Sequence, residues 1–153
     1  MQTIAKQVRQ VPTMQEIKQL QEIVGIAPQI ELPLKHHHSV GAYVREIFMP
    51  AGSVVIGKEH ATRHLNIVVS GKCTVWTVDG KHVFDAKDGP ITFESMAGVK
   101  KVLYMHTNVV WMTVHPTDET DPDRLENIFI RPEEQLSLFP ELDMDVLALE
   151  ILK

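Results

Sequence analysis

Short runs of apolar residues, each ended by a turn signal, follow one another from residue 40 to residue 115. Runs of this length without a sustained helical period are typical of β-strands. The sequence predicts eight strands: VGAYVREIF, SVVIG, HLNIVV, KCTVWTV, HVFDA, PITFE, KKVLYMH and VVWMTVH. Turn residues separate them, and Asp79-Gly80 gives the strongest hairpin signal. We therefore expect a mainly β fold, an antiparallel barrel or jelly roll.

The stretch PTMQEIKQLQEIVG, residues 12–25, has a helical period instead. Thr13 followed by Glu16 forms a capping box, and Gly25 stands where a helix would end in a left-handed residue. The apolar face of this helix holds Ile17, Leu20, Ile23 and Val24. An amphipathic helix of about three turns is marginal alone, so we expect it to pack on the barrel.

Several predicted strands are apolar on both faces. In KCTVWTV, Cys73 and Val75 alternate with Trp76 and Val78, and VVWMTVH shows the same pattern. An antiparallel strand with one wet face should alternate between apolar and polar residues, so these strands need cover on the outside too. The amino-terminal helix covers one patch, and a second subunit is the expected cover for another. We predict a homo-oligomer on this ground.

The two ends of the chain differ from its centre. Residues 1–35 are expected to form the helix and a linker that pack on the barrel, and residues 36–116 the barrel itself. Residues 117–153 form an acidic, Pro-punctuated linker, which we expect to leave the barrel, and a C-terminal extension with a short helix over 143–152. The extension carries exposed apolar residues, which suit docking on the barrel or on a partner.

Charge and composition exclude some functions. Residues 1–117 carry twelve Lys and Arg against nine Asp and Glu, whereas residues 118–153 carry three against eleven, so the charges are +3 and −8. This balance argues against nucleic-acid binding. Cys73 is the only cysteine, which excludes an intrachain disulfide and favours a buried thiol. With no apolar signal core or membrane-span window, we expect a protein of the cytoplasm without a membrane partner.

Histidines provide the candidate chemistry. His36, His37 and His38 are consecutive and point in different directions, so we interpret them as a loop that enters the first strand. His60 and His64 are four residues apart between two predicted strands. Along one straight strand their side chains would lie about 13 Å apart. Sharing one metal ion therefore requires the chain to turn across Ala61-Thr62-Arg63. The glutamate of a zinc-protease helix is missing after His60, which excludes that class.

The segment PAGSVVIGKEHATRHLNIVVSG resembles the first motif of the cupin superfamily. The resemblance places His60 at the second histidine ligand, His64 at the glutamate ligand and Lys58 at the first histidine ligand. The segment GPITFESMAGVKK is similar to the second motif, with Lys101 where the fourth ligand would stand. The resemblance implies a cupin barrel, but lysine is normally protonated and repels a cation. A complete iron or zinc site of the usual kind is therefore not expected.

A second resemblance bears on where the protein is located and on its partners. The string GAYVREIFMPAGSVVIGKEHATRHLNIVVSG, followed by VWMTVHPTDETD, resembles small uncharacterised cupin-like proteins of tailed bacteriophages. That likeness implies location in the host cytoplasm or in a virion, and virion or phage proteins as partners for the C-terminal extension. The polar residues expected near a barrel mouth are Tyr43, Arg45, Glu46, Lys58, Asn66, Lys101 and Tyr104.

Three functions from different classes remain open. The leading one is a non-catalytic cupin that binds a ligand or a partner, as an oligomeric phage accessory or virion component. The alternative is an isomerase, hydrolase or oxygenase that uses one divalent ion held by His60, His64 and a third ligand, Glu46 or one of His36 to His38. Zinc, iron and manganese fit it equally. A metal-free isomerase or epimerase of the sugar-nucleotide kind is the third. Two arrangements of the strand HLNIVV are also open, with His64 and Asn66 either in water or inside the barrel.

Overall fold

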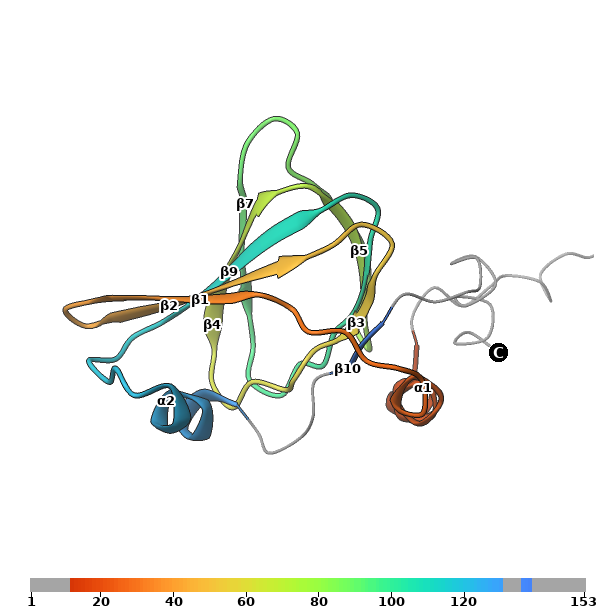
Figure 1. Ribbon diagram of the computed structural model, residues 1–153, viewed down its shortest axis with the longest axis horizontal. Helices are drawn as coiled ribbons and strands as arrows, with labels where there is room; N and C mark the ends of the chain where they lie inside the picture. The colour runs from red at the N-terminus through yellow and green to blue at the C-terminus, as the bar shows by residue number, and fades with distance from the viewer. Residues whose placement is uncertain (1–11, 131–135, 139–153) are drawn as a thin grey trace, which may run out of the picture.

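A computed structural model describes residues 12–130 and 136–138, and the strand pattern of the sequence is present in it (Figure 1). The helices are α1 (Met14–Gly25) and α2 (Pro122–Phe129). The strands are β1 (Leu34–Ser39), β2 (Ala42–Met49), β3 (Val54–Ile56), β4 (His64–Ser70), β5 (Lys72–Thr77), β6 (Gly80–Asp85), β7 (Ile91–Ser95), β8 (Val102–Met105), β9 (Val109–His115) and β10 (Leu136–Leu138). All eight predicted strands are confirmed, with β1 and β10 in addition.

The strands form two antiparallel sheets that face each other. One has the order β1-β2-β9-β4-β7 and the other the order β10-β3-β8-β5-β6. The main apolar core lies between them and includes Val68, Val75, Met105 and Trp111. The predicted hairpin joins β5 to β6, but Thr77 pairs with Gly80, so the turn residues are Val78 and Asp79.

Helix α1 covers the outer face of the second sheet. Its capping box is present, since the Thr13 side chain accepts from the Glu16 amide and the Glu16 carboxylate accepts from the Thr13 amide. Ile17, Leu20 and Val24 are buried against Val54, Ile56, Trp76 and Val102. The expectation of a left-handed Gly25 is wrong, because Gly25 is the last helical residue and has no positive φ.

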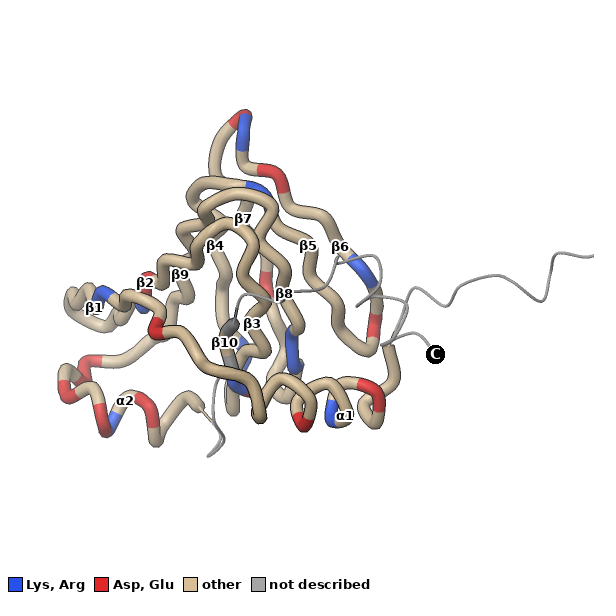
Figure 2. Tube along the Cα trace, turned by 45° about the vertical axis from the view of Figure 1, so that its right-hand side comes forward, with Lys and Arg blue, Asp and Glu red and all other residues tan. Residues whose placement is uncertain are grey.

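The segment after β9 folds back on the barrel, contrary to the expectation that it leaves. Thr117 donates its amide to the Gly41 carbonyl, and the Asp118 side chain accepts from the Gly41 amide. Asp121 then caps α2 by accepting from the Asp123 and Arg124 amides. The end of α2 is attached to the barrel, since the Ala61 amide donates to the Phe129 carbonyl at 2.7 Å. Acidic residues lie in α2 and in the turn before it (Figure 2).

The structure also bears on the expectations for the three consecutive histidines and for Cys73. His36, His37 and His38 lie within the exposed strand β1, not in a loop before it, because β1 pairs along its whole length with β2. The predicted helix over 143–152 lies outside the described residues. Cys73 is a buried free thiol, as predicted, and burial raises its pKa to about 12. Neither described helix is long and apolar enough to cross a bilayer.

Candidate functional site

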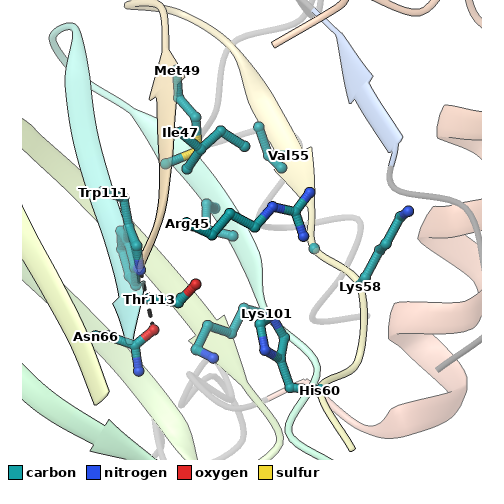
Figure 3. Close-up of a pocket in the computed structure, with 12 residues that line it drawn as sticks. Arg45, Ile47, Met49, Val55, Lys58, His60, Asn66, Lys101, Trp111 and Thr113 are labelled. Carbon is teal, nitrogen blue, oxygen red and sulfur yellow. Dashed lines mark hydrogen bonds between the residues drawn. The ribbon is translucent and has the colours of Figure 1, made fainter. Parts of the chain in front are cut away.

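A cavity of about 80 Å³ lies between the two sheets and divides into an apolar and a cationic part (Figure 3). Its walls come from β2, β3, β4, β8 and β9 and from the segments before β4 and β8. The apolar lining residues are Ile47, Met49, Val55, Leu103 and Trp111. The polar lining residues are Arg45, Lys58, His60, Asn66, Lys101 and Thr113. Among residues 12–130 and 136–138, no carboxylate lines this cavity.

The strand alternation of β4 decides which of its side chains reach the interior. His64, Asn66 and Val68 are buried, whereas Leu65 is 44% exposed. The arrangement with His64 and Asn66 inside the barrel is therefore the one observed. The Asn66 amide is held in the cavity wall, where it donates to Ser95 Oγ at 2.8 Å and accepts from Trp111 Nε1 at 3.1 Å.

The two lysines of the cavity differ in their partners. Lys58 forms an ion pair with Glu126 on α2, and the hydrogen bond from Lys58 lowers the pKa of that carboxyl. Lys101, just before β8, is only 9% exposed and has no hydrogen-bond or ion-pair partner among the described residues. Burial penalises its charged form and lowers the pKa of the Lys101 amine to about 8.

Arg45 adds the third cationic side chain. Within the described part of the chain no carboxylate forms an ion pair with it. Its charge reaches the neighbouring imidazoles, because Arg45 contributes to the lowered pKa values of His60 and His115. The described lining of the cavity therefore combines positive charge with no carboxylate, which favours an anionic ligand.

Three histidines from different segments gather beside this cavity. The ring centroids of His60 and His64 are 4.1 Å apart, and His115 at the end of β9 lies 5.4 Å and 5.3 Å from them. Phe129 of α2 stacks on His115 at 4.2 Å. His64 Nδ1 donates to the Thr62 carbonyl, so its Nε2 carries the lone pair. His60 Nδ1, His64 Nε2 and His115 Nδ1 are buried without a partner among the described residues.

Burial keeps these imidazoles neutral. Desolvation lowers the pKa of His60 to about 2, with further contributions from His64 and Lys101. Desolvation, with the charges of His64 and Arg45, lowers the pKa of His115 to about 4. The pKa of His64 is lowered as well, mainly by burial. The cluster therefore presents hydrogen-bond acceptors at neutral pH and adds no positive charge.

Comparison with known proteins bears on the fold. No protein-family model matches the sequence, and no curated protein matches it. Among solved structures, ectoine synthase from P. lautus matches with a TM-score of 0.53 and 13% identity over 81% of this chain and 90% of that one. A mutant salicylate 1,2-dioxygenase from Pseudoaminobacter salicylatoxidans, in complex with gentisate, matches with a TM-score of 0.51 and 10% identity over 78% of this chain and 35% of that one.

A third match has a lower TM-score. It is an RmlC-like cupin family protein with a double-stranded β-helix fold from Methanocaldococcus jannaschii, with a TM-score of 0.45 and 13% identity over 63% of this chain and 86% of that one. This chain shares the fold of ectoine synthase and of the dioxygenase, in which two antiparallel sheets face each other. At such identities the likeness shows the fold alone, so the site has to be interpreted from this chain's own residues.

The residues at the cupin ligand positions do not fit a metal ion as they are arranged. Lys58 and Lys101 provide ammonium groups where the resemblance implies ligands. A coordinated imidazole holds the ion in its ring plane, about 2.1 Å from the nitrogen. The planes of His60, His64 and His115 are instead nearly parallel, at 12° to 33°. Over the described ranges, no group of three His, Cys, Asp or Glu side chains could hold a metal.

The structure brings some of the predicted site residues to the cavity and places others elsewhere. Arg45, Lys58, His60, Asn66 and Lys101 line it. His64 lies beside it in the histidine cluster, and Tyr43 stacks on His115 at 6.1 Å and contacts His36 Nδ1 through its hydroxyl at 2.6 Å.

Glu46 and Tyr104 are not at the cavity. Glu46 accepts from His37 and pairs with Lys35, on the face of β2 opposite to Arg45. Tyr104 packs with the core that α1 covers. The third partner suggested for the histidine pair, Glu46 or one of His36 to His38, is thus not beside it, and His115 is.

His115 was not predicted from the sequence. It ends a run that indicates only a strand, and nothing in its spacing links it to His60 or His64. The link is the strand order, because β9 lies between β2 and β4, with Leu65 opposite Val114 and Tyr43 opposite His115. Predicting that His115 lies beside His60 and His64 would have required the correct pairing of strands that are far apart in sequence.

Proposed function

We propose that this cupin-fold protein is a non-catalytic binding protein that takes a small organic anion into the cavity between its sheets. One observation carries the proposal. Arg45, Lys58 and Lys101 line the cavity, and the described residues provide neither a carboxylate in its lining nor a partner for the buried Lys101. A buried cation without a partner costs folding free energy, which a bound anion would recover.

The size and the apolar part of the cavity narrow the ligand class. A cavity of about 80 Å³ is about half as large as the roughly 150 Å³ cavity that holds benzene. The enclosed part of a ligand is therefore a fragment of a few heavy atoms. Ile47, Met49 and Trp111 favour a hydrocarbon portion, and the Thr113 hydroxyl, buried without a partner in the described ranges, offers a further hydrogen bond. A short-chain carboxylate meets these requirements.

A metal-dependent enzyme is the second candidate, an isomerase, hydrolase or oxygenase that uses His60 and His64. The observation in its favour is the set of three buried ring nitrogens without partners among the described residues, which includes His115. The imidazoles would have to rotate out of their stack to bind an ion. Elemental analysis of untagged protein tests this candidate. Less than roughly a tenth of an equivalent of zinc, iron or manganese, unchanged in the H60A/H64A double variant, removes it.

We further propose that the chain is a homo-oligomer and serves as a phage accessory or virion component. The resemblance to cupin-like proteins of tailed phages supports this setting, in the host cytoplasm or in the virion, with the C-terminal extension contacting phage proteins. Self-association is supported by the outer face of the first sheet, where Phe48 and Leu65 are 36% and 44% exposed. Light scattering well above micromolar concentration tests it, and a monomer would contradict it.

The binding proposal is tested with ligand pairs that differ only in charge. Thermal unfolding is followed with propionate and propionamide at equal ionic strength. A ligand that binds only the folded state stabilises it by about 2.7 kcal/mol at 100 times its Kd. We expect propionate to raise Tm and propionamide to have little effect. R45Q should weaken the shift, and R63Q, at an exposed arginine paired with Glu94, should not. Equal shifts for both ligands would contradict the proposal.

A further inference from the structure

The amine of Lys101 has the surroundings of a nucleophile. It lies at a cavity open to small molecules, its residue is 9% exposed, and the described residues offer it no hydrogen-bond acceptor or ion-pair partner. It also borders a second cavity, lined by Asp79, His82 and Glu94, and pairs with none of them. Glu94 is paired with Arg63 instead. Nothing in the described chain therefore fixes a proton on the Lys101 amine.

Lys58 provides an internal comparison within the same cavity. Its ammonium is held in an ion pair by Glu126, and the side chain is 20% exposed. The Lys58 nitrogen is therefore engaged by a carboxylate, whereas the Lys101 nitrogen has no such partner among the described residues. Lys101 shares this cavity with Arg45, Lys58 and the neutral imidazole of His60, whereas Asp79 and Glu94 lie in the second cavity. Burial disfavours the charged form of the Lys101 amine.

We propose that Lys101 captures a small carbonyl compound with an anionic group, such as a 2-oxo acid, as a reversible imine. The neutral Nζ attacks the carbonyl carbon, and the C–N bond forms as the carbonyl π electrons pass to oxygen. Proton transfer from nitrogen to oxygen gives a carbinolamine. Loss of the hydroxyl with a second proton from nitrogen releases one water and leaves the C=N bond. No oxidant or reductant takes part.

The cavity can orient such a compound. Arg45 offers a forked donor for the carboxylate, and the Thr113 hydroxyl, which has no hydrogen-bond partner among the described residues, can donate or accept near the carbonyl. The apolar side chains of Ile47 and Met49 accommodate a short alkyl group. This inference rests on the proposed anion binding and names the covalent step and the ligand class within it.

Amine chemistry makes the expected selectivity large. With a pKa of about 8, Lys101 is neutral in roughly a quarter of molecules at pH 7.5. An ordinary lysine, with a pKa of about 10.4, is neutral in about one molecule in a thousand at this pH. At low pyruvate concentration, labelling at Lys101 should therefore exceed labelling at an exposed lysine by on the order of 100-fold.

The test traps the imine with pyruvate as the probe. The full chain is incubated with pyruvate and sodium cyanoborohydride at pH 7.5, and the reduced adduct is counted by intact mass and located by peptide mapping. Lactate, which lacks the carbonyl, serves as the ligand control. The variants are K101R, K58R and K72R, of which Lys72 is exposed on β5. Thermal shifts with pyruvate and lactate are measured on the same samples.

We expect one adduct on Lys101 with pyruvate, none with lactate, loss of the adduct in K101R, and retention in K58R and K72R. If K101R does not fold, peptide mapping of the wild-type adduct still shows which lysine reacted. Thermal shifts with both ligands but no adduct would overturn the imine and leave anion binding in place. No shift and no adduct would overturn both. Adducts spread over exposed lysines would overturn the special role of Lys101.

Discussion

Helices α1 and α2 both cover the barrel with a few apolar side chains, at its lower end in Figures 1 and 2, yet they enclose different surroundings. Beneath α1, Ile17, Leu20 and Val24 meet a wholly apolar layer. Beneath α2, Phe129 contacts His115, and behind it lie imidazole nitrogens that have no partner in the described part of the chain. A short amphipathic helix thus closes an apolar core at one place and covers a polar site at the other.

We expect the largest loss of stability from a substitution in the apolar layer beneath α1. Leu20→Ala removes a side chain that is 3% exposed and should lower the free energy of unfolding by about 2–5 kcal/mol, because it leaves a cavity in a packed layer. Urea unfolding measures the change. Ile23→Ala, on the same helix but 61% exposed, is the matched control and should change stability by less than about 0.5 kcal/mol. Equal losses in both variants would contradict the assignment of the buried face.

The next prediction changes the polar cavity in the opposite direction. Lys101→Met removes a buried cation and should raise the free energy of unfolding at pH 7 by on the order of 1–3 kcal/mol, while propionate no longer raises Tm. The folded pKa of about 8 is below the unfolded one, so the unfolded chain binds more protons between the two values. Wild-type stability should therefore rise with pH from about 8 to the ordinary lysine pKa.

The Lys101→Met variant should not show this rise in stability with pH. The difference in free energy of unfolding between the variant and the wild type should therefore shrink as the pH rises. Urea unfolding at pH 7 and at about pH 10.5 checks it. A variant less stable than wild type at both pH values would show that Lys101 stabilises the fold through contacts, contrary to the account.

A smaller effect concerns the histidines beneath α2. Their folded pKa values are lowered, to about 4 for His115 and about 2 for His60, so below about pH 6.5 the unfolded chain binds more protons. Stability should fall as the pH decreases from 6.5 to 4. His115→Leu removes one of these groups and should reduce the slope of stability against pH in this range. An unchanged slope in urea unfolding would show that His115 is not buried in its neutral form.

The smallest expected effect is at the ion pair that joins α2 to the cavity. Glu126→Gln leaves Lys58 without its carboxylate, and because Glu126 is 49% exposed, stability should change by less than about 1 kcal/mol. Propionate should bind more tightly, since Lys58 then attracts the ligand without competition. The matched control is Glu94→Gln, which releases Arg63 outside the cavity and should leave propionate binding unchanged. Weaker binding in Glu126→Gln would contradict the cationic role of Lys58.

Local sequence signals account for most of the fold and part of the site. The capping box, the apolar face of α1 and the eight strands follow from patterns within a few residues of one another, and the structure confirms them. The resemblance to the cupin motifs placed Lys58, His60 and Lys101 at ligand positions, and all three line the cavity.

The remaining features depend on pairing across the chain. His115 joins the cluster because β9 lies between β2 and β4, and the acidic segment returns because Gly41 and Ala61 bind it. Glu46 and Tyr104 alternate with residues that do face the interior, and strands that are apolar on both sides hide which set that is. Contacts of this kind have no signature in a short window of sequence.

A crystal structure grown with saturating propionate tests the central claim most directly. We expect the carboxylate in the cavity between the sheets, within hydrogen-bond distance of Lys101 Nζ and of Arg45, with its ethyl group toward Ile47 and Met49. A cavity that holds only water under these conditions, or a metal ion bound by His60, His64 and His115 in rotated positions, would contradict it.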